Sequence, residues 1–383
     1  MGAGPRSDPQ RAGAAAHGVL VYHACRASRC PRSHEGVTQR KLAQALAGIA
    51  GLDWGGDFDP DTRYPGPVYF VLSDTLCSLD EARRLGIHGE QDLFGGVVPH
   101  AFVATKVITH PLLDAASAAP EGWSPGFAER VRDVVLPGCS VFALRDAEAA
   151  AARLLAEGGV RLKRASGIGG SGQAVITDPS EIASHLGPDA DAELARDGLV
   201  LECNLAEVET YSVGQVRVGD LLASYVGTQC STHNNRGEEV YGGSRLSVAR
   251  GDFEALLRLD LPPEVRSAVA QARRYHEAAL AAFPGMFASR CNYDVVRGVD
   301  HAGRPRSGVL EQSWRIGGAS GAEVAALAAF RGDPGLDVVR ASTTEVYGAA
   351  PQVPPDALVY FSGEDERVGP ITKYSRLESH GHP

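Results

Sequence analysis

The chain has 383 residues, 44% of them hydrophobic and 22% charged, which suffices for two or three domains with buried cores. Acidic residues outnumber basic ones by 47 to 37, the net charge is −10 and no Lys/Arg-rich run occurs, which argues against nucleic-acid and membrane-surface partners. No apolar run approaches the roughly 18 residues of a membrane span, and the seven cysteines form no C-x-x-C pair, as is typical of reduced thiols in a cytoplasmic protein.

The N-terminal part of the chain predicts an α/β domain. Residues 1–16 are rich in Pro, Gly and Ala and lack the apolar core of a signal peptide, so we expect a disordered tail. Residues 17–136 then alternate between strand and helix patterns. The expected elements are strands over residues 18–24 and 67–73 and helices over residues 37–50 and 79–85.

A more regular pattern follows and predicts a small domain over residues 137–205. Its expected elements are strands over residues 141–144, 160–163, 173–177 and 199–202 and helices over residues 146–157 and 180–186.

Residues 206–336 predict a larger antiparallel domain, in which Gly219-Asp220 is a favourable hairpin turn. Residues 337–383, with two further expected strands, are assigned to a C-terminal extension. The expected elements after residue 206 are strands over residues 211–218, 221–228, 289–297, 308–312, 342–347 and 357–361 and helices over residues 264–282 and from 321 onward.

The most informative segment is LKRASGIGGSGQAVI, residues 162–176. Gly167, Gly169 and Gly172 match G-x-G-x-x-G, the dinucleotide-binding pattern, in which glycines let backbone N–H groups approach phosphate oxygens. That pattern requires a helix after its last glycine, whereas residues 173–177 are rich in β-branched residues and read as a strand. No Gly-Lys-Ser/Thr follows, which excludes a Walker loop. The segment therefore predicts a strand–loop–strand phosphate loop, and a flexible hairpin without a ligand is the alternative.

Two charged residues accompany this loop. Lys163 lies at the end of the first strand, within an apolar run, and can pair with nucleotide phosphates. Glu202 ends the strand over residues 199–202, where a carboxylate can accept hydrogen bonds from an adenine or a ribose. The alternatives are a solvated surface lysine and an ordinary charge at the end of a strand.

Two carboxylates lie on apolar strands that a Gly-rich turn makes antiparallel neighbours: Asp294 in RCNYDVV and Glu311 in VLEQSWR. Carboxylates are costly to bury without a positive partner, and Mg²⁺ takes oxygen ligands and nucleotide phosphates. Ser313 points the same way as Glu311 and can add an oxygen ligand, and Arg315 on that face suits a phosphoryl group. The alternative is a structural network in which Arg315 pairs with either carboxylate.

The order of these features resembles the ATP-grasp superfamily over roughly residues 67–330. Within it, the phrases ATKVITHPL, LKRASGIGGSGQ, ETYSVGQVRVGDLLASYVGTQ and LEQSWRIGGASGAE are similar to an uncharacterised bacterial ATP-grasp-like family. The resemblance implies an α/β (α+β) fold of ATP-grasp type. That fold would comprise an N-terminal α/β domain of the pre-ATP-grasp kind, a small lid domain and a C-terminal core domain with an antiparallel sheet.

The resemblance also implies roles for individual residues. Lys106 and Lys163 would contact ATP phosphates, and Arg315 would steady the γ-phosphoryl group and the acyl phosphate. Glu202 would lie at the hinge, near the adenine or ribose. The loop that closes over the phosphates would comprise Gly167, Gly169, Gly170, Ser171 and Gly172. The ligands of Mg²⁺, with Mn²⁺ as an alternative cation, would be Asp294, Glu311 and Ser313.

The chain departs from the superfamily pattern at three positions. Ser313 stands where an Asn is usual. Asn292 stands where many relatives place an Arg, for which Arg290 can substitute. Arg164 replaces a common Pro after the loop lysine.

The implied activity is a Mg-ATP-dependent ligase that converts a small-molecule carboxylate to an acyl phosphate and transfers the acyl group to an amine, thiol or hydroxyl. A non-catalytic ATP-binding module and a kinase-like phosphotransferase are the alternatives, and a homo-oligomer is left open. The polar, Gly-rich stretch over residues 227–244 is expected to be a loop lining the acceptor pocket through Asn234, Asn235 and Arg236, with a solvated surface loop as its alternative.

Overall fold

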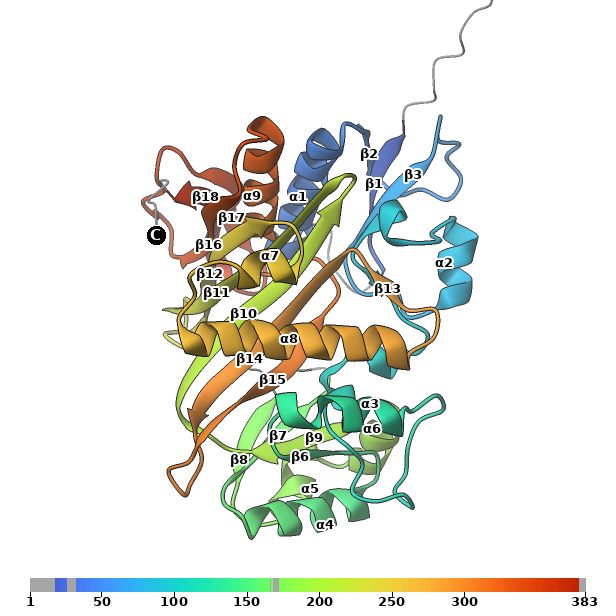
Figure 1. The fold of residues 1–383 in the computed structure, drawn as a ribbon, viewed down its shortest axis with the longest axis vertical. Coiled ribbons are helices and arrows are strands. Elements are labelled where there is room, and N and C mark those ends of the chain that lie inside the picture. Colours follow the sequence, from blue (N-terminus) through green and yellow to red (C-terminus); the bar gives the residue numbers. More distant parts are fainter. Residues whose placement is uncertain (1–17, 26–31, 166, 168–171, 379–383) are drawn as a thin grey trace, which may run out of the picture.

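The computed structural model describes residues 18–25, 32–165, 167 and 172–378. The predicted tail over residues 1–16 lies outside the described residues. Three groups of elements are visible in Figure 1: a parallel sheet near the N-terminus, a long antiparallel sheet through the middle, and a small sheet with its own helices at one end. The predicted α/β (α+β) class with an antiparallel core sheet is confirmed by this arrangement.

The N-terminal part forms a four-stranded parallel sheet in the order β2-β1-β3-β4. Helix α1 packs on this sheet because Leu42, Leu46 and Ile49 lie on its buried face. It begins where the Ser33 hydroxyl accepts a hydrogen bond from the Gly36 backbone N–H, a standard N-cap. The elements are β1 (Val19–His23), α1 (His34–Ala50), β2 (Asp53–Asp57), β3 (Val68–Leu72), α2 (Leu79–Leu85) and β4 (Leu93–Phe94).

A sheet of eight strands, the large sheet, spans the molecule in the order β15-β14-β10-β11-β12-β16-β18-β17, and every neighbouring pair is antiparallel. Helix α8 contacts β10, β14 and β15, whereas α9 contacts β12, β16 and β18 (Figure 1). The elements are β10 (Ala206–Val218), β11 (Leu221–His233), β12 (Glu239–Arg250), α8 (Pro263–Ala282), β14 (Arg290–Val299), β15 (Pro305–Ser313), α9 (Ser320–Gly332), β16 (Val338–Tyr347), β17 (Leu358–Asp365) and β18 (Gly369–Glu378).

Two features of the large sheet differ from the expectations. The stretch over residues 227–244 is not a loop: β11 runs to His233 and β12 starts at Glu239, so most of it is a long hairpin. From Cys230 to His233, half-buried and exposed residues alternate as in a strand, whereas the glycines and polar residues of the stretch had indicated a loop. Residues after 337 add the strands β16, β17 and β18 to the large sheet. They are therefore part of the core sheet and do not form a separate extension.

The small sheet has the order β6-β9-β7-β8 and is antiparallel throughout. The predicted strand–loop–strand is present, because β7 and β8 pair with Lys163 opposite Gln173. Helix α4 starts at Leu144, two residues before the start expected from the sequence, and Asp146 accepts a hydrogen bond from the Ala118 backbone N–H. The elements are β6 (Gly138–Val141), α4 (Leu144–Leu155), β7 (Val160–Arg164), β8 (Gln173–Ile176), α5 (Glu181–Leu186), α6 (Ala190–Asp197) and β9 (Leu199–Cys203).

The segments between the sheets are short helices, 3₁₀ turns and one two-stranded ribbon. Those before residue 135 lie in the chain between α2 and β6, and two further ones lie on either side of α8. These are η1 (Glu90–Asp92), β5 (Gly96–Val97), η2 (Ala101–Ala104), η3 (Lys106–Thr109), α3 (Pro125–Val131), η4 (Arg132–Val134), α7 (Phe253–Leu257) and β13 (Phe287–Ala288).

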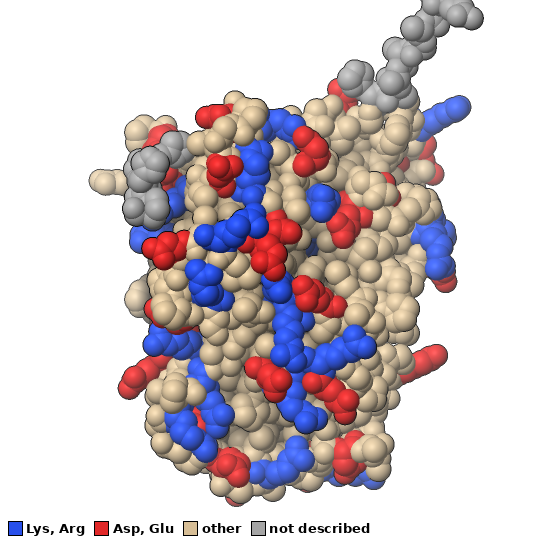
Figure 2. All heavy atoms as spheres, viewed as in Figure 1, with Lys and Arg blue, Asp and Glu red and all other residues tan. Residues whose placement is uncertain are grey.

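The surface carries both signs of charge. On the face shown in Figure 2, acidic and basic side chains are interspersed, and no wide area of a single sign is visible. Across the described part of the chain, none of the helices combines the length and the apolar character needed to cross a bilayer.

Candidate functional site

A cavity of about 970 Å³ lies between the small sheet and the large sheet and continues toward α1 and the last strands. Its walls come from three separate parts of the chain. Six of the predicted site residues line it: Lys163, Glu202, Asp294, Glu311, Ser313 and Arg315. The fold therefore gathers residues that span about 150 positions of sequence into one space.

Two carboxylates face each other on neighbouring strands of the cavity floor. In the antiparallel register of β14 and β15, Asp294 lies opposite Glu311 and Asn292 lies opposite Ser313. The Asp294 carboxylate accepts hydrogen bonds from the side-chain amides of Gln229 and Asn292, each at 3.0 Å. Burial, followed by the charge of Glu311, raises the pKa of Asp294 to about 6. The pair thus carries excess negative charge that a cation would relieve.

Lys106 supplies one positive charge to this pair. Its Nζ lies 2.6 Å from Glu311 Oε2 and donates a hydrogen bond of 2.8 Å to the carbonyl oxygen of Gly167. The lysine is only 5% exposed, because η3 is held against β15 by Gln312, whose side-chain amide donates to the Thr105 carbonyl. Lys106 therefore joins the glycine loop to the carboxylate pair.

A second buried cation–anion contact lies in the small sheet. The Lys163 ammonium contacts Glu202 Oε1, and both side chains are almost fully buried. His110 Nε2 lies 3.1 Å from the other oxygen of Glu202. Burial opposes ionisation of this carboxyl, but the charge of Lys163 and the contact with His110 outweigh it and lower the pKa of Glu202. Glu202 is therefore held as a carboxylate between two nitrogen groups.

The role of His110 was not anticipated from the sequence. It follows Lys106 by four positions in ATKVITHPL, but no spacing rule links a histidine there to the strand that ends with Glu202. The ring packs against Gly138, where an added Cβ would lie 2.8 Å from its Cε1 and Nδ1. Only the packing of η3 against β6 and β9 shows the contact.

A third buried ion pair supports the far end of the two strands. The Arg290 guanidinium contacts the Glu323 carboxylate, with Nη2 to Oε1 at 2.7 Å, and both side chains are inaccessible to solvent. Arg290 Nη1 also lies 3.3 Å from the Ser313 hydroxyl. The Tyr225 hydroxyl donates to Glu323 at 2.6 Å. The participation of Glu323 and Tyr225 was missed, because they come from α9 and β11 and no local pattern marks them.

Arg315 lies beyond the end of β15 and still lines the cavity. Its Nε is 3.7 Å from Asp74 Oδ1, so it bridges the large sheet and the N-terminal part.

The glycine loop is described only at its two ends. The Gly167 N–H donates to the Arg164 carbonyl at 3.2 Å, and Gly172 adopts a positive φ of 68° where its carbonyl accepts from Arg164. Arg164 itself turns away and contacts Glu193 of α6 at 2.8 Å. The predicted loop residues Gly169, Gly170 and Ser171 lie outside the described residues.

The expected acceptor-pocket residues lie elsewhere. Asn234, Asn235 and Arg236 are at the tip of the β11–β12 hairpin and do not line the cavity. The Asn235 side-chain amide donates to the carbonyls of Val368 and Pro370, at 2.6 and 2.9 Å. That prediction is wrong: Asn235 fastens the hairpin tip to the turn between β17 and β18.

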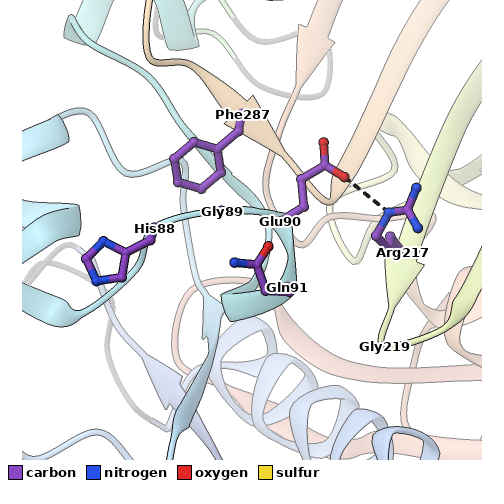
Figure 3. Close-up of a pocket in the computed structure, with 7 residues that line it drawn as sticks. All are labelled: His88, Gly89, Glu90, Gln91, Arg217, Gly219 and Phe287. Carbon is purple, nitrogen blue, oxygen red and sulfur yellow. Dashed lines mark hydrogen bonds and ion pairs between the residues drawn. The ribbon is translucent and has the colours of Figure 1, made fainter.

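A second, more open pocket of about 500 Å³ lies near α2 and the β10–β11 turn (Figure 3). An ion pair in its wall joins Arg217 Nε to Glu90 Oε2 at 3.1 Å. None of the predicted site residues that the structure describes lines it. The residues around it are His88, Gly89, Glu90, Gln91, Arg217, Gly219 and Phe287.

The donor set for a metal ion consists of two carboxylates and one hydroxyl. Among the residues that the structure describes, no group of three or more His, Cys, Asp or Glu side chains is placed to hold a metal. The facing pair Asp294 and Glu311, with the raised pKa of Asp294, fits a hard divalent cation that takes further oxygens from a phosphate.

Several solved structures are similar to this chain. N5-carboxyaminoimidazole synthetase from Staphylococcus aureus, complexed with ADP, shares 12% identity with a TM-score of 0.49, over 96% of this chain and 94% of that one. The biotin carboxylase domain of Hydrogenobacter thermophilus 2-oxoglutarate carboxylase, with MgADP, shares 11% identity and a TM-score of 0.46, over 94% and 86%. D-alanyl-alanine synthetase A from Vibrio cholerae shares 10% identity and a TM-score of 0.46, over 83% and 94%.

No curated protein sequence matches the chain. The match to a family extends over residues 21–375, nearly the whole chain. The protein belongs to the family described as "Protein of unknown function (DUF3182)".

Proposed function

We propose that the protein is a Mg-ATP-dependent ligase that activates a carboxylate as an acyl phosphate. The observation that carries this proposal is the position of Lys106, which contacts both the glycine-loop carbonyl of Gly167 and the Glu311 carboxylate. A lysine between a phosphate loop and an acidic pair is suited to a nucleotide triphosphate with its cation.

The nucleotide fits the half of the cavity next to the small sheet. Leu136, Leu205 and Val296 form a small apolar cluster there, with Cys203 and Leu310 at its edge, and all five line the cavity. An adenine ring would bury its faces on these side chains. Lys163 and Lys106 are within reach of the same space and are assigned to the phosphates, with Glu202 at the hinge and residues 167–172 as the closing loop.

Asp294 and Glu311 would hold the Mg²⁺, with the Ser313 hydroxyl as a further ligand. When bound, the cation would withdraw charge from the phosphate oxygens and favour attack at the γ-phosphorus. Lys106 and Arg315 are this chain's own cations beside the reacting groups, and they stabilise the negative charge that develops there. We assign Arg315 to the γ-phosphoryl group and the acyl phosphate.

The proposed reaction has two steps. A carboxylate oxygen attacks the γ-phosphorus, the bond from that phosphorus to the β-phosphate oxygen breaks, and ADP leaves. An amine, thiol or hydroxyl then attacks the acyl carbon, loses its proton, and inorganic phosphate departs. Closure of the glycine loop excludes water, which would otherwise hydrolyse the acyl phosphate.

One observation favours a second candidate, a non-catalytic ATP-binding module. The Ser313 hydroxyl and carbonyl both lie within hydrogen-bond distance of Arg290 Nη1, which limits the freedom of Ser313 to serve as a ligand. A weakened third ligand lowers the affinity for the cation and with it the rate of phosphoryl transfer.

The test is incubation with Mg-ATP, a panel of carboxylates and hydroxylamine, followed by measurement of ADP and hydroxamate. The ligase predicts both products, and Glu311→Gln is expected to lose them while the protein stays folded. A stable phosphoester with ADP indicates a kinase. Nucleotide binding without turnover, unaffected by Glu311→Gln, refutes both catalytic functions.

A further inference from the structure

The cavity continues past the carboxylate pair into a second half, the outer half, between the start of α1 and strands β16 and β18. Its walls include His34 and Thr38 of α1, Glu345 of β16, and Lys373 and Tyr374 of β18. The nucleotide assigned above occupies the other half. The outer half is therefore the space open to the remaining substrates.

An ion pair lies in the wall of this outer half. Glu345 and Lys373 are directly opposite each other on β16 and β18, and Lys373 Nζ lies 2.8 Å from Glu345 Oε1. Their side chains are only 13% and 14% exposed, for Lys373 and Glu345 respectively. Exposed ion pairs contribute little stability, and partly buried ones lose much of their attraction to desolvation. Stability alone is thus a weak reason for this pair.

Two helices begin at the same space. Residues Gly317, Gly318 and Ala319, just before α9, line the cavity, as does the first turn of α1. The partial positive charge of a helix N-terminus favours a carboxylate or another anion nearby. The start of α1 already donates the His34 backbone N–H to Asp365 Oδ2 at 2.8 Å. Lys373 and the start of α9 are thus the groups that attract an anion in the outer half, whereas Glu345 attracts a cation.

His34 provides a further sign of a missing partner. Its Nδ1 is buried and has no hydrogen-bond partner among the described residues. Burial and the nearby charge of Lys373 lower the pKa of His34, although the charges of Glu35, Asp365 and Glu345 oppose this. A buried polar nitrogen without a partner is costly unless a ligand or a water satisfies it.

We propose that the outer half binds a zwitterion of the amino-acid class, with Glu345 contacting its ammonium group and Lys373 its carboxylate. A zwitterion of this class carries its ammonium group and its carboxylate on one carbon. These two charges match the neighbouring Glu345 and Lys373, because each charge of the ligand then lies beside a side chain of opposite charge. A simple amine would be repelled by Lys373 and a simple acid by Glu345. The inference deepens the proposed function, on which it rests: the zwitterion would be the acceptor or the donor of the acyl group.

The test measures binding to the full-length protein without nucleotide. The twenty common amino acids and D-alanine are each tested by thermal shift, and hits are quantified by calorimetry. Each hit is compared with the amine that lacks its carboxylate and with the acid that lacks its amino group. We expect the zwitterion to bind and both relatives to bind about tenfold or more weakly, because each loses one charge-assisted contact.

Three variants complete the experiment. Lys373→Met and Glu345→Gln are each expected to weaken zwitterion binding about tenfold or more. Lys41→Met, on α1 but outside the cavity, is the matched control and should bind normally. Stabilisation by Mg-ADP, measured on every variant, reports an intact nucleotide half. Three outcomes would overturn the proposal. The amine or the acid could bind as tightly as the zwitterion, both cavity variants could bind the zwitterion as the wild type does, or no amino acid in the panel could bind.

The two proposals fail separately. If Mg-ADP does not stabilise the wild type, the proposed function fails, whereas a zwitterion that binds and is lost in Lys373→Met still supports the outer site. If Mg-ADP binds and no zwitterion does, the ligase proposal stands and this one is refuted.

Discussion

Replacing Glu202 by Gln tests the buried charge network of the small sheet. The substitution keeps the size of the side chain but leaves Lys163, which is 3% exposed, with a neutral partner. Removing one partner of a buried pair costs about 3–5 kcal/mol, because the remaining charge stays desolvated. The amide oxygen of the new glutamine can still accept a hydrogen bond from Lys163. We therefore expect the free energy of unfolding to fall by about 3 kcal/mol, the lower end of that range.

Urea denaturation followed by circular dichroism measures this loss, with Glu193→Gln as the matched control. Glu193 pairs with Arg164 in the same small sheet region, but the two side chains are 19% and 32% exposed. We expect that control to cost no more than about 1 kcal/mol. A double-mutant cycle with Lys163→Met isolates the coupling between the two charges. A loss below about 1 kcal/mol in Glu202→Gln, or additive effects in the cycle, would refute the reasoning.

Three further predictions follow from other contacts. The pKa of Asp294, raised to about 6, means that the folded protein holds a proton the unfolded chain has released, so stability falls as pH rises from about 4 to 6. Urea titrations at pH 4 and pH 7.5 measure this fall in the free energy of unfolding, which is up to about 3 kcal/mol in the wild type and should be absent in Asp294→Asn. An equal fall in both proteins would contradict the prediction. Gly138→Ala should cost about 1–3 kcal/mol in the same assay, because its Cβ would meet the His110 ring at 2.8 Å, and no loss would contradict this. Asn235→Ala should leave hydroxamate formation unchanged, since Asn235 lies outside the cavity, and a large loss would restore its acceptor role.

The strand–loop–strand around the glycines could be predicted because it depends on neighbouring residues. The β-branched run after Gly172 favours a strand, and the structure places Gln173–Ile176 beside β7. The facing of Asp294 and Glu311 was predictable for the same reason, since a short turn joins the two strands and alternation sets the face. The roles assigned to these residues stay predictions until the assays above are done.

Predictions based on composition were less successful. Glycines and polar residues over 227–244 indicated a loop, whereas the residues pair as strands within an eight-stranded sheet. Strand pairing is decided by the neighbours on both sides, and β16, which pairs with β12, is far away in sequence. The same limitation hid β18, whose partners are β16 and β17.

The sequence by itself determined the local pieces of this protein: the hairpin that carries the glycine loop, the two facing carboxylates and the order of the strands and helices along the chain. Only the tertiary structure decided which distant groups meet. Lys106 reaches Glu311, His110 reaches Glu202, and Arg290 reaches Glu323 through the packing of separate elements. The physical reason is that hairpins and alternation act over a few residues. A buried charge, by contrast, finds its partner wherever the folded chain brings one within a few ångströms.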